Sequence, residues 1–229
     1  MTTSIEEAGD QAFTISFGDG FDPATSARTL ATTERLAAAR PEGVTDVVPG
    51  YGSLLVAYDP LRTSAADVRA WIAGALAGPA PAPAARRVEI PVLYDPDDPQ
   101  VGPDLRELAD EKGLGVAALV ALHVAPEYRC HLLGFRPGFP FLGGLDERLV
   151  AARLPSPRLR VPAGSVGIGG RQTGVYPVES PGGWRLIGRT PLRLFDPARP
   201  DPFLVRPGDT VRFASVDRAT FARLAGASP

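Results

Sequence analysis

Three phenylalanine rings fall within an irregular stretch of the sequence, residues 134–144, which reads GFRPGFPFLGG. Two prolines and four glycines accompany these rings, a composition that suits neither a helix nor a regular strand. Two interpretations are open: a hairpin whose rings fill a core, or a stiff loop that holds the rings around a ligand. In either case Pro137 stiffens the backbone, and Gly138 permits a turn between Phe135 and Phe139. We expect at least one of these two rings to border a pocket or a partner protein.

A second stretch, residues 162–174, reads PAGSVGIGGRQTG and could bring backbone N–H groups close to an anion. Its spacing matches neither the phosphate-binding loop, which needs Lys and then Ser or Thr after its last glycine, nor the dinucleotide-binding fingerprint. One interpretation is a tight loop that presents Ser165, Gln172 and Thr173 as polar donors. The other is a series of corners in a β-barrel, where the chain needs glycine.

Arginines are concentrated in the same part of the chain: Arg158, Arg160, Arg171, Arg185 and Arg189. A guanidinium group can hold a carboxylate or a phosphate through two parallel hydrogen bonds. For any single arginine of this group, a solvated surface charge is the simpler interpretation. Trp184 lies among them, and it could be a core residue or the wall of a pocket.

The two histidines and the single cysteine are also candidates for chemistry. His123 shares a helical face with apolar residues, which favours a half-buried histidine bonded to the backbone. His131 stands in a predicted strand that leads into residues 134–144, so it could lie beside a ligand. Cys130 faces the other side of that strand and is interpreted as a core residue. No Gly-x-Ser-x-Gly motif occurs, so a hydrolase triad has little support.

Composition narrows the class of protein. The chain has 229 residues, 44% of them hydrophobic and 22% charged, which is typical of folded globular proteins. Its net charge of −2 argues against nucleic acid as a partner. With one cysteine and two histidines we expect no internal disulfide and no metal site. The acidic N-terminus lacks the apolar core of a signal peptide, and no apolar run approaches the roughly 18 residues of a membrane span, so a cytoplasmic protein is predicted.

The first third of the chain alternates strands and helices. Apolar and polar residues alternate over 13–17, and Asp22 followed by Pro23 is typical of a helix start. The other elements predicted here are strands at 44–48 and 53–58, a helix capped by Thr63 or Ser64, and a run at 86–94 that could supply a last strand. The order β-α-β-β-α predicts a ferredoxin-like arrangement.

The proline- and alanine-rich stretch 78–87 is typical of a linker, and we place a domain boundary there, which gives domains 1–83 and 84–229. Two short helices are predicted next, at 102–113 and 115–123. From residue 128 onward, short apolar runs are broken by Gly and Pro every few residues, which favours an all-β barrel or sandwich. A short helix capped by Ser215 follows.

Three long stretches carry a resemblance to a known family: residues 134–149, 155–196 and 202–209. They closely resemble the PxpB/KipI family, the first subunit of prokaryotic 5-oxoprolinase, also labelled allophanate hydrolase subunit 1. Related sequence forms part of the carboxyltransferase region (subdomains C and D) of urea carboxylase. The stretch 51–64 is similar to the N-terminal domain of the family. The resemblance implies an α+β protein, with a ferredoxin-like N-terminal domain followed by a cyclophilin-like β-barrel.

The resemblance also implies a role within a complex that uses ATP to open the lactam 5-oxoproline to glutamate. The expected partners are a paired subunit of related cyclophilin-like barrel fold and a third, separately folded subunit, and it stays open whether ATP contacts this chain. A lactam is a poor electrophile, and charge that develops on its oxygen and on phosphate calls for arginines and backbone donors. Two alternatives remain: an inhibitor that binds a histidine kinase without turnover, and a subunit of urea or allophanate metabolism.

Matching motif positions and their neighbours supply the candidate residues, without a nucleophile or base among them. The candidates for binding substrate or an anion are His131, Arg158, Arg160, Ser165, Gln172, Thr173 and Arg189. The candidates for a pocket wall are Phe135, Pro137, Gly138, Phe139, Phe141 and Trp184. The sequence departs from the family pattern at 95–99, where Asp-Pro-Asp-Asp-Pro replaces a glycine pair, so the role of that loop stays open.

Overall fold

The computed structural model describes residues 3–18, 22–77 and 86–227. The chain divides into two units, Met1–Ala84 and Ala85–Pro229, each with its own hydrophobic core. The boundary predicted between residues 83 and 84 lies outside the described residues. Within the described ranges, no helix is long and apolar enough to cross a membrane.

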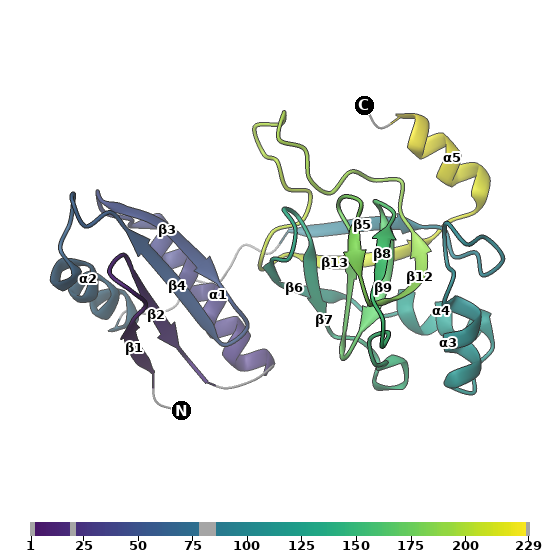
Figure 1. The fold of residues 1–229 in the computed structure, drawn as a ribbon, viewed down its shortest axis with the longest axis horizontal. Helices are drawn as coiled ribbons and strands as arrows, with labels where there is room; N and C mark the ends of the chain where they lie inside the picture. The colour runs from purple at the N-terminus through teal and green to yellow at the C-terminus, as the bar shows by residue number, and fades with distance from the viewer. Residues whose placement is uncertain (1–2, 19–21, 78–85, 228–229) are drawn as a thin grey trace. The chain divides into compact units, whose positions relative to one another are not determined.

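The N-terminal unit is a four-stranded antiparallel sheet with two helices packed against one face (Figure 1). The strand order across the sheet is β1-β2-β4-β3. Its elements are β1 (Ser4–Glu7), β2 (Ala12–Ser16), α1 (Pro23–Ala38), β3 (Val44–Pro49), β4 (Ser53–Tyr58) and α2 (Ala65–Ala77).

Local sequence signals account for these elements. Phe13 and Ile15 alternate along β2 and are fully buried, as expected for a strand with one face on the core. The Asp22 carboxylate accepts a hydrogen bond from the Thr25 amide at 2.7 Å, and the Ser64 hydroxyl accepts one from the Asp67 amide at 3.1 Å. Both are N-cap bonds that satisfy helix-end donors. The predicted helix starts are therefore confirmed, with Ser64 rather than Thr63 as the second cap.

One strand of the ferredoxin-like prediction is wrong. Residues 86–94 do not close the N-terminal sheet, because the strand at 87–92 pairs within the second unit instead. The fourth position in the N-terminal sheet is taken by β1, an edge strand that the sequence pattern did not reveal. It reaches β2 through a tight turn in which the Ala8 amide donates to the Ala12 carbonyl at 2.8 Å. The order is thus β-β-α-β-β-α rather than a split βαβ unit.

The second unit is a barrel with short helices beside it (Figure 1). Its first half contains β5 (Arg87–Val92), α3 (Leu105–Glu111), α4 (Val116–Val124), β6 (Tyr128–Leu133), β7 (Pro140–Gly143) and the 3-10 turn η1 (Glu147–Leu149). Its second half contains β8 (Arg158–Val161), β9 (Ser165–Gly169), β10 (Gln172–Val175), β11 (Ser180–Gly182), β12 (Arg185–Arg189), β13 (Thr210–Ser215) and α5 (Arg218–Ala227).

Seven strands form the barrel sheet in the order β12-β9-β10-β7-β6-β13-β5, and β8 and β11 pair separately as a ribbon. The two edges meet where Leu93 and Arg189 exchange backbone hydrogen bonds of 2.8 and 2.9 Å, so the sheet is nearly closed. Closure removes the unpaired edges that an open sheet would expose. Leu105, Leu108 and Leu119 of α3 and α4 belong to the barrel core. The predicted α+β class and barrel are confirmed.

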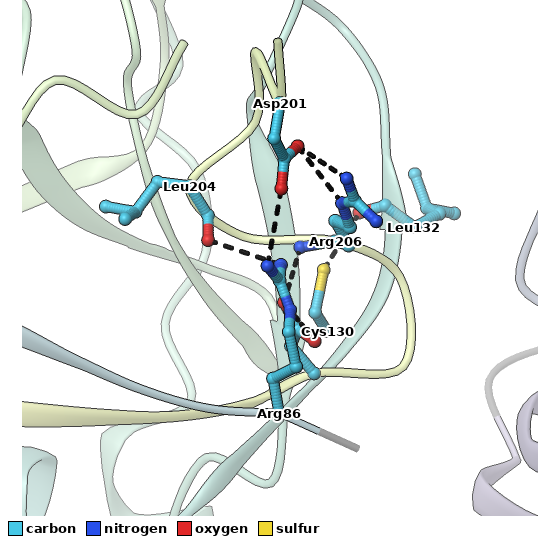
Figure 2. Close-up of polar contacts among 7 residues, drawn as sticks. Arg86, Cys130, Leu132, Asp201, Leu204 and Arg206 are labelled. Carbon is cyan, nitrogen blue, oxygen red and sulfur yellow. Dashed lines mark hydrogen bonds and ion pairs between the residues drawn. The ribbon is translucent and has the colours of Figure 1, made fainter. Parts of the chain in front are cut away.

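A polar cluster, here called the clasp, fastens the start of the second unit (Figure 2). The guanidinium of Arg86 donates from Nε and Nη2 to the Asp209 carboxylate, at 3.1 and 2.7 Å. The Arg206 amide donates to the same carboxylate at 2.8 Å, and its guanidinium pairs with Asp201 at 2.6 Å. The backbone of Asp209 also bonds that of Cys130 at 2.9 Å. The clasp therefore joins the first described residue of this unit to the turn before β13.

The predicted cap of the last helix is wrong by two residues. Ser215 is the end of strand β13, and the Asp217 carboxylate accepts the hydrogen bond from the Thr220 amide, at 2.7 Å. Both residue types favour N-cap positions, so only the point where the strand ends decides between them.

Candidate functional site

The loop between β6 and β7 contains two consecutive tight turns. The Phe139 amide donates to the Arg136 carbonyl at 3.0 Å, with Pro137 and Gly138 at the two central positions and φ +82° at the glycine. This is a type II turn, as the Pro-Gly pair predicts. Just before it, the Arg136 amide donates to the Gly134 carbonyl at 2.6 Å, across Phe135.

Phe135 holds a strained backbone conformation. Its φ is +63°, in the left-handed region that side chains larger than glycine rarely adopt. The hydrogen bond across it makes a γ-turn of the strained, positive-φ kind. The ring is also 57% exposed, although it contacts Phe139 edge-to-face at 5.6 Å. Strain of this kind persists only where the surroundings impose it, and it is frequent at ligand sites.

Aromatic rings surround a cavity of about 180 Å³ beside this loop, here called the aromatic cavity. Phe139, Tyr176 and Trp184 are almost completely buried and form its floor, while Phe135 stands at its lip. The cavity is lined by Phe135, Phe139, Phe141, Arg153, Leu154, Pro157, Tyr176, Gly182, Gly183 and Trp184. Phe139 fills a core, as the first interpretation predicts, and Phe135 and Phe139 both border a cavity, as we expected. That the loop holds its rings around a ligand stays a prediction.

Glycines in the neighbouring strands make room for these rings. A Cβ atom on Gly169 would lie 2.6 Å from three atoms of the Trp184 indole. A Cβ atom on Gly182 would lie 2.3 Å from the Tyr176 hydroxyl oxygen. Real Cβ contacts are not this short, so the rings occupy space that only glycine leaves free. A Cβ atom on Gly174 would lie 3.1 Å from two ring atoms of Phe139, so the glycine-rich stretch also packs against the aromatic stretch.

Arg153 is a member of the cavity wall that the sequence patterns did not single out. Its guanidinium carbon lies 6.0 Å from the centre of the Trp184 ring, within the range of a cation–π contact. In the described residues it makes no ion pair, so its charge is available to a ligand. No local motif marks this arginine, because only the fold brings residue 153 beside residue 184.

The predicted polar loop at 162–174 is wrong. Ser165 lies in β9, while Gln172 and Thr173 lie in β10, and the two strands pair antiparallel through a tight turn. Ser165 and Thr173 are buried, and Gln172 pairs with Gly169 beside the turn. The backbone N–H groups of this stretch are used in the sheet, so they do not form an anion-binding loop. The stretch forms two barrel strands, and the alternative interpretation of barrel corners is confirmed in part, because Gly164 and Gly170 adopt positive φ at the turns on either side of β9.

Thr173 belongs to a buried chain of hydrogen bonds with His123 and Tyr94. The Tyr94 hydroxyl lies 2.8 Å from His123 Nδ1, and His123 Nε2 lies 2.9 Å from Thr173 Oγ1. Because Thr173 donates its hydroxyl proton to the Gly167 carbonyl, His123 Nε2 donates to Thr173 and Nδ1 accepts from Tyr94. Burial lowers the pKa of His123 to about 3. The expectation of a half-buried histidine bonded to backbone is therefore wrong: it is fully buried and bonded to side chains.

His131 and Cys130 are neighbours in β6 that are both buried. A register irregularity between Cys130 and Leu132 interrupts the alternation of the strand, which lets two consecutive side chains turn inward. Burial, with the nearby charge of Arg129, lowers the pKa of His131 to about 4. Burial also raises the pKa of the Cys130 thiol. The core assignment of Cys130 is confirmed, and His131 does not line the aromatic cavity.

The predicted arginines are dispersed rather than gathered at one site. Arg158 pairs with the buried carboxylate of Asp104 at 2.5 Å, and the same carboxylate accepts a hydrogen bond from the Leu186 amide at 2.6 Å. Arg160 is largely exposed and lies 3.8 Å from Glu179. The remaining pairs are Arg171 with Glu147, Arg185 with Glu107 and Glu111, and the backbone contact of Arg189 with Ala163. The Asp104 carboxylate thus connects the start of α3 to strands β8 and β12.

Fold and site together define an α+β protein in which a nearly closed barrel carries an aromatic cavity with one arginine at its wall. Residues 3–205 match the family described as carboxyltransferase domain, subdomain C and D. The chain belongs to this family.

Two curated relatives of the chain share one name, the B subunit of 5-oxoprolinase. The chain is 57% identical to the relative of Escherichia coli O157:H7 over 131 residues, which cover 57% of this chain and 59% of that protein. It is 38% identical to the relative of Bacillus subtilis (strain 168) over 232 residues, or 95% of this chain and 94% of that one. The match therefore spans less than two thirds of the E. coli relative and almost all of the B. subtilis relative.

Solved structures show the same fold. TTHA0988 superposes with a TM-score of 0.81 and 45% identity, over 90% of this chain and 40% of the TTHA0988 chain. The Kluyveromyces lactis urea carboxylase superposes with a TM-score of 0.73 over 96% of this chain and 22% of its own, at 18% identity. At that identity the second likeness concerns the fold alone.

Proposed function

We propose that this chain is a subunit of an ATP-dependent 5-oxoprolinase, and that its aromatic cavity takes part of the lactam substrate or of a reaction intermediate. The relatives named as the B subunit of 5-oxoprolinase support the reaction, since one of them matches over 95% of this chain. The aromatic cavity carries the proposal, because it combines ring walls, one uncommitted arginine and a strained aromatic lip in a single small space.

The chemistry of the cavity suits a small cyclic acid. Its volume of about 180 Å³ is well below the ~300–1,000 Å³ typical of sites for drug-sized ligands, so it suits a molecule of few heavy atoms. 5-Oxoproline is a five-membered lactam that bears one carboxylate. Its ring faces would contact Phe139 and Trp184, and Arg153 would pair with its carboxylate. Phe135 would exclude water from the exposed side.

The residues of this chain do not supply the whole reaction. The glycine-rich stretch forms strands β9 and β10, so it does not fit a phosphate-binding loop. The lining of the aromatic cavity includes no carboxylate or histidine that could act as a base. The consumption of ATP by the complex would supply the activation that a lactam needs before water can open it. We therefore assign binding and orientation to this chain, and activation to a paired subunit of related barrel fold and a third subunit.

The proposal is tested with the complete assembly. The chain is co-expressed with its two companion subunits, and glutamate released from 5-oxoproline is measured with and without ATP, with urea and allophanate as comparison substrates. We expect ATP-dependent glutamate release from the assembly and none from the chain alone. An assembly that forms but releases no glutamate would falsify the proposed reaction.

Matched variants separate the role of the cavity from that of the assembly. Phe135→Ala and Arg153→Gln are expected to lower kcat/KM for 5-oxoproline by at least about tenfold, which corresponds to one lost charge-assisted or aromatic contact. Leu61→Ala removes a side chain that is 94% exposed in the other unit and serves as the control. If both cavity variants kept full activity, the reaction could stand but the cavity would not be its binding site.

A further inference from the structure

A second and larger cavity lies between strand β12 and helix α5. Its volume is about 400 Å³, and no residue of the aromatic cavity contributes to it. The wall is formed by Ala163, Gly164, Pro177, Arg189, Thr190, Pro191, Leu192, Arg193, Phe221 and Ala225. Two arginines and no carboxylate are part of this wall, so its lining carries a net positive charge.

Arg189 is held in place by a contact that leaves most of its donors unused. Its Nε donates to the Ala163 carbonyl at 3.0 Å, and both residues line the cavity. Neither terminal nitrogen has a hydrogen-bond or ion-pair partner within the described ranges. A positioned guanidinium with free terminal N–H groups can hold an oxyanion through two parallel bonds.

Arg193 is only weakly neutralised by its own surroundings. Its nearest acid is Asp196, at 3.4 Å, and that carboxylate is shared with Arg199 at 3.5 Å. Both distances exceed the roughly 2.7–2.9 Å of strong charge-assisted bonds. The single carboxylate therefore faces two guanidinium groups, and a positive charge remains on this side of the cavity.

The opposite wall is apolar and comes from α5, whose start is tied to the barrel unit. Arg218 at the first turn of α5 donates to Asp95 at 2.6 Å and to Asp98 at 2.9 Å. These acids are part of the loop that departs from the family pattern. The hydrogen bond from Arg218 is the main cause of the lowered pKa of Asp95, whereas the pKa of Asp98 is lowered first by the Gln100 amide and then by Arg218. These ion pairs of Arg218 anchor the start of α5, and Phe221, one turn further along the helix, lines the cavity.

We propose that this second cavity is a binding site for a small organic oxyanion, a phosphate or carboxylate that carries an apolar body. The anionic group lies between Arg189 and Arg193, and the apolar body lies against Leu192 and Phe221. Gly164 is required at this wall, because a Cβ atom there would lie 2.2 Å from the Thr190 carbonyl oxygen. The site is independent of the lactam proposal, since the two cavities share no residue.

The test uses the full-length chain and two simple probes, phenyl phosphate and benzoate, with benzyl alcohol as the uncharged control. Binding is measured by isothermal titration calorimetry at low ionic strength. We expect saturable binding of at least one anion and none of benzyl alcohol; the preferred probe tells whether the site takes phosphoryl or carboxylate groups. Arg189→Gln and Arg193→Gln should each weaken binding about tenfold.

Control variants decide between a site and a general charge effect. Arg160→Gln removes the same charge from an arginine whose side chain is 83% exposed, and it should leave binding unchanged. Phe221→Ala should weaken binding of the ring-bearing probes but not of inorganic phosphate. The proposal is overturned if neither anion binds saturably, or if Arg160→Gln weakens binding as much as Arg193→Gln does. Arg193 is exposed and lies outside the strands, so we expect Arg193→Gln to fold. This variant keeps the test valid even if Arg189→Gln fails to fold.

Discussion

The clasp around Asp209 and the lip around Phe135 are two regions of the same barrel unit that use polar and aromatic groups in opposite ways. In the clasp, one buried carboxylate accepts hydrogen bonds from Arg86 and from the Arg206 amide, so its acceptors are well used. At the lip, an aromatic ring is 57% exposed on a backbone with φ +63°. The first arrangement pairs a buried charge within the fold, whereas the second leaves an apolar ring in water on a strained backbone.

This difference supports the proposal that the aromatic cavity is the binding site. A strained and exposed phenylalanine contributes little to stability, and a chain selected for folding alone has no reason to hold one. The clasp, by contrast, is accounted for by the groups that it joins. Four substitutions or conditions test this contrast, in order of the effect on stability that we expect from a single residue, from the largest to the smallest.

Removal of the clasp carboxylate should have the largest effect. Asp209→Ala removes the carboxylate that accepts from the Arg86 guanidinium and the Arg206 amide. We expect the free energy of unfolding to fall by about 3 kcal/mol. This value is at the low end of the range for a broken buried ion pair, because Arg86 is partly hydrated. Urea denaturation followed by circular dichroism measures it. Asp201→Ala is the control, since that carboxylate is 43% exposed and its loss should cost less than about 1 kcal/mol. Equal effects would mean that burial of the clasp does not matter.

A methyl group added next to Trp184 in the aromatic cavity should have the second largest effect on stability. Gly169→Ala places a Cβ atom 2.6 Å from the Trp184 indole, and we expect a loss of about 2 kcal/mol as the ring is displaced. Tryptophan fluorescence and urea denaturation both report this. Gly74→Ala is the matched control: nothing lies within 4 Å of its Cβ position in helix α2, so this variant should be slightly stabilised. An unchanged Gly169→Ala protein would contradict the tight fit of the floor.

Mild acid should weaken the barrel through its buried histidines. The pKa of His123 is lowered to about 3 and that of His131 to about 4, whereas both titrate near 6.5 in the unfolded chain. The unfolded state therefore binds more protons below about pH 6.5, and stability falls as the pH is lowered from there towards 4. At about one pH unit below the unfolded pKa, each histidine should cost about 1.4 kcal/mol.

The histidine contribution can be isolated within a narrow pH window. Carboxylates with lowered pKa values titrate below about 4, so the slope of unfolding free energy between pH 5.5 and 7 reports histidines. In His131→Gln this slope should fall by about half. A slope that is flat in the unmodified protein would show that neither histidine is kept neutral by the fold.

Relief of strain at the lip should have the smallest effect on stability. Phe135→Gly adopts φ +63° without strain, which offsets the lost ring contacts with Phe139 and Tyr176, so the unfolding free energy should stay within about 1 kcal/mol. The same variant should lose activity in the assembled complex. A destabilisation above about 2 kcal/mol would instead place Phe135 with the core, and the contrast between clasp and lip would disappear.

Features governed by neighbouring residues were predictable from the sequence. The Pro137–Gly138 turn, the N-cap at Asp22 and the alternation of Phe13 and Ile15 each depend on a few consecutive residues, and each is found in the structure. The cap at Ser215 failed because the length of strand β13 is set by its pairing with β5, far away in the chain. The strand β1 was missed because an edge strand of four residues carries little pattern of its own.

Only some residues of the candidate site could be predicted from the sequence. The aromatic residues were recognisable as a group because they are close in sequence, and Arg189 was recognised as a candidate for binding an anion. Arg153 and Arg193 were not. The polar residues Thr173 and Ser165 resembled a ligand-binding loop, but their strands turn them into the core. A polar residue type indicates what a group can bond to, and its position in the fold decides whether the partner is a ligand or another side chain.

By itself, the sequence determined that this protein has an α+β fold with a barrel, that it belongs with a recognisable family, and that a rigid aromatic loop lies in that barrel. Those properties follow from residue order and local backbone preference, which act over a few positions. Only the tertiary structure decided that Trp184 lies over Gly169, that Leu93 meets Arg189 to close the barrel, and that Arg153 lines the aromatic cavity. Contacts of this kind arise from the packing of distant segments, and a local pattern carries no record of which segments will meet.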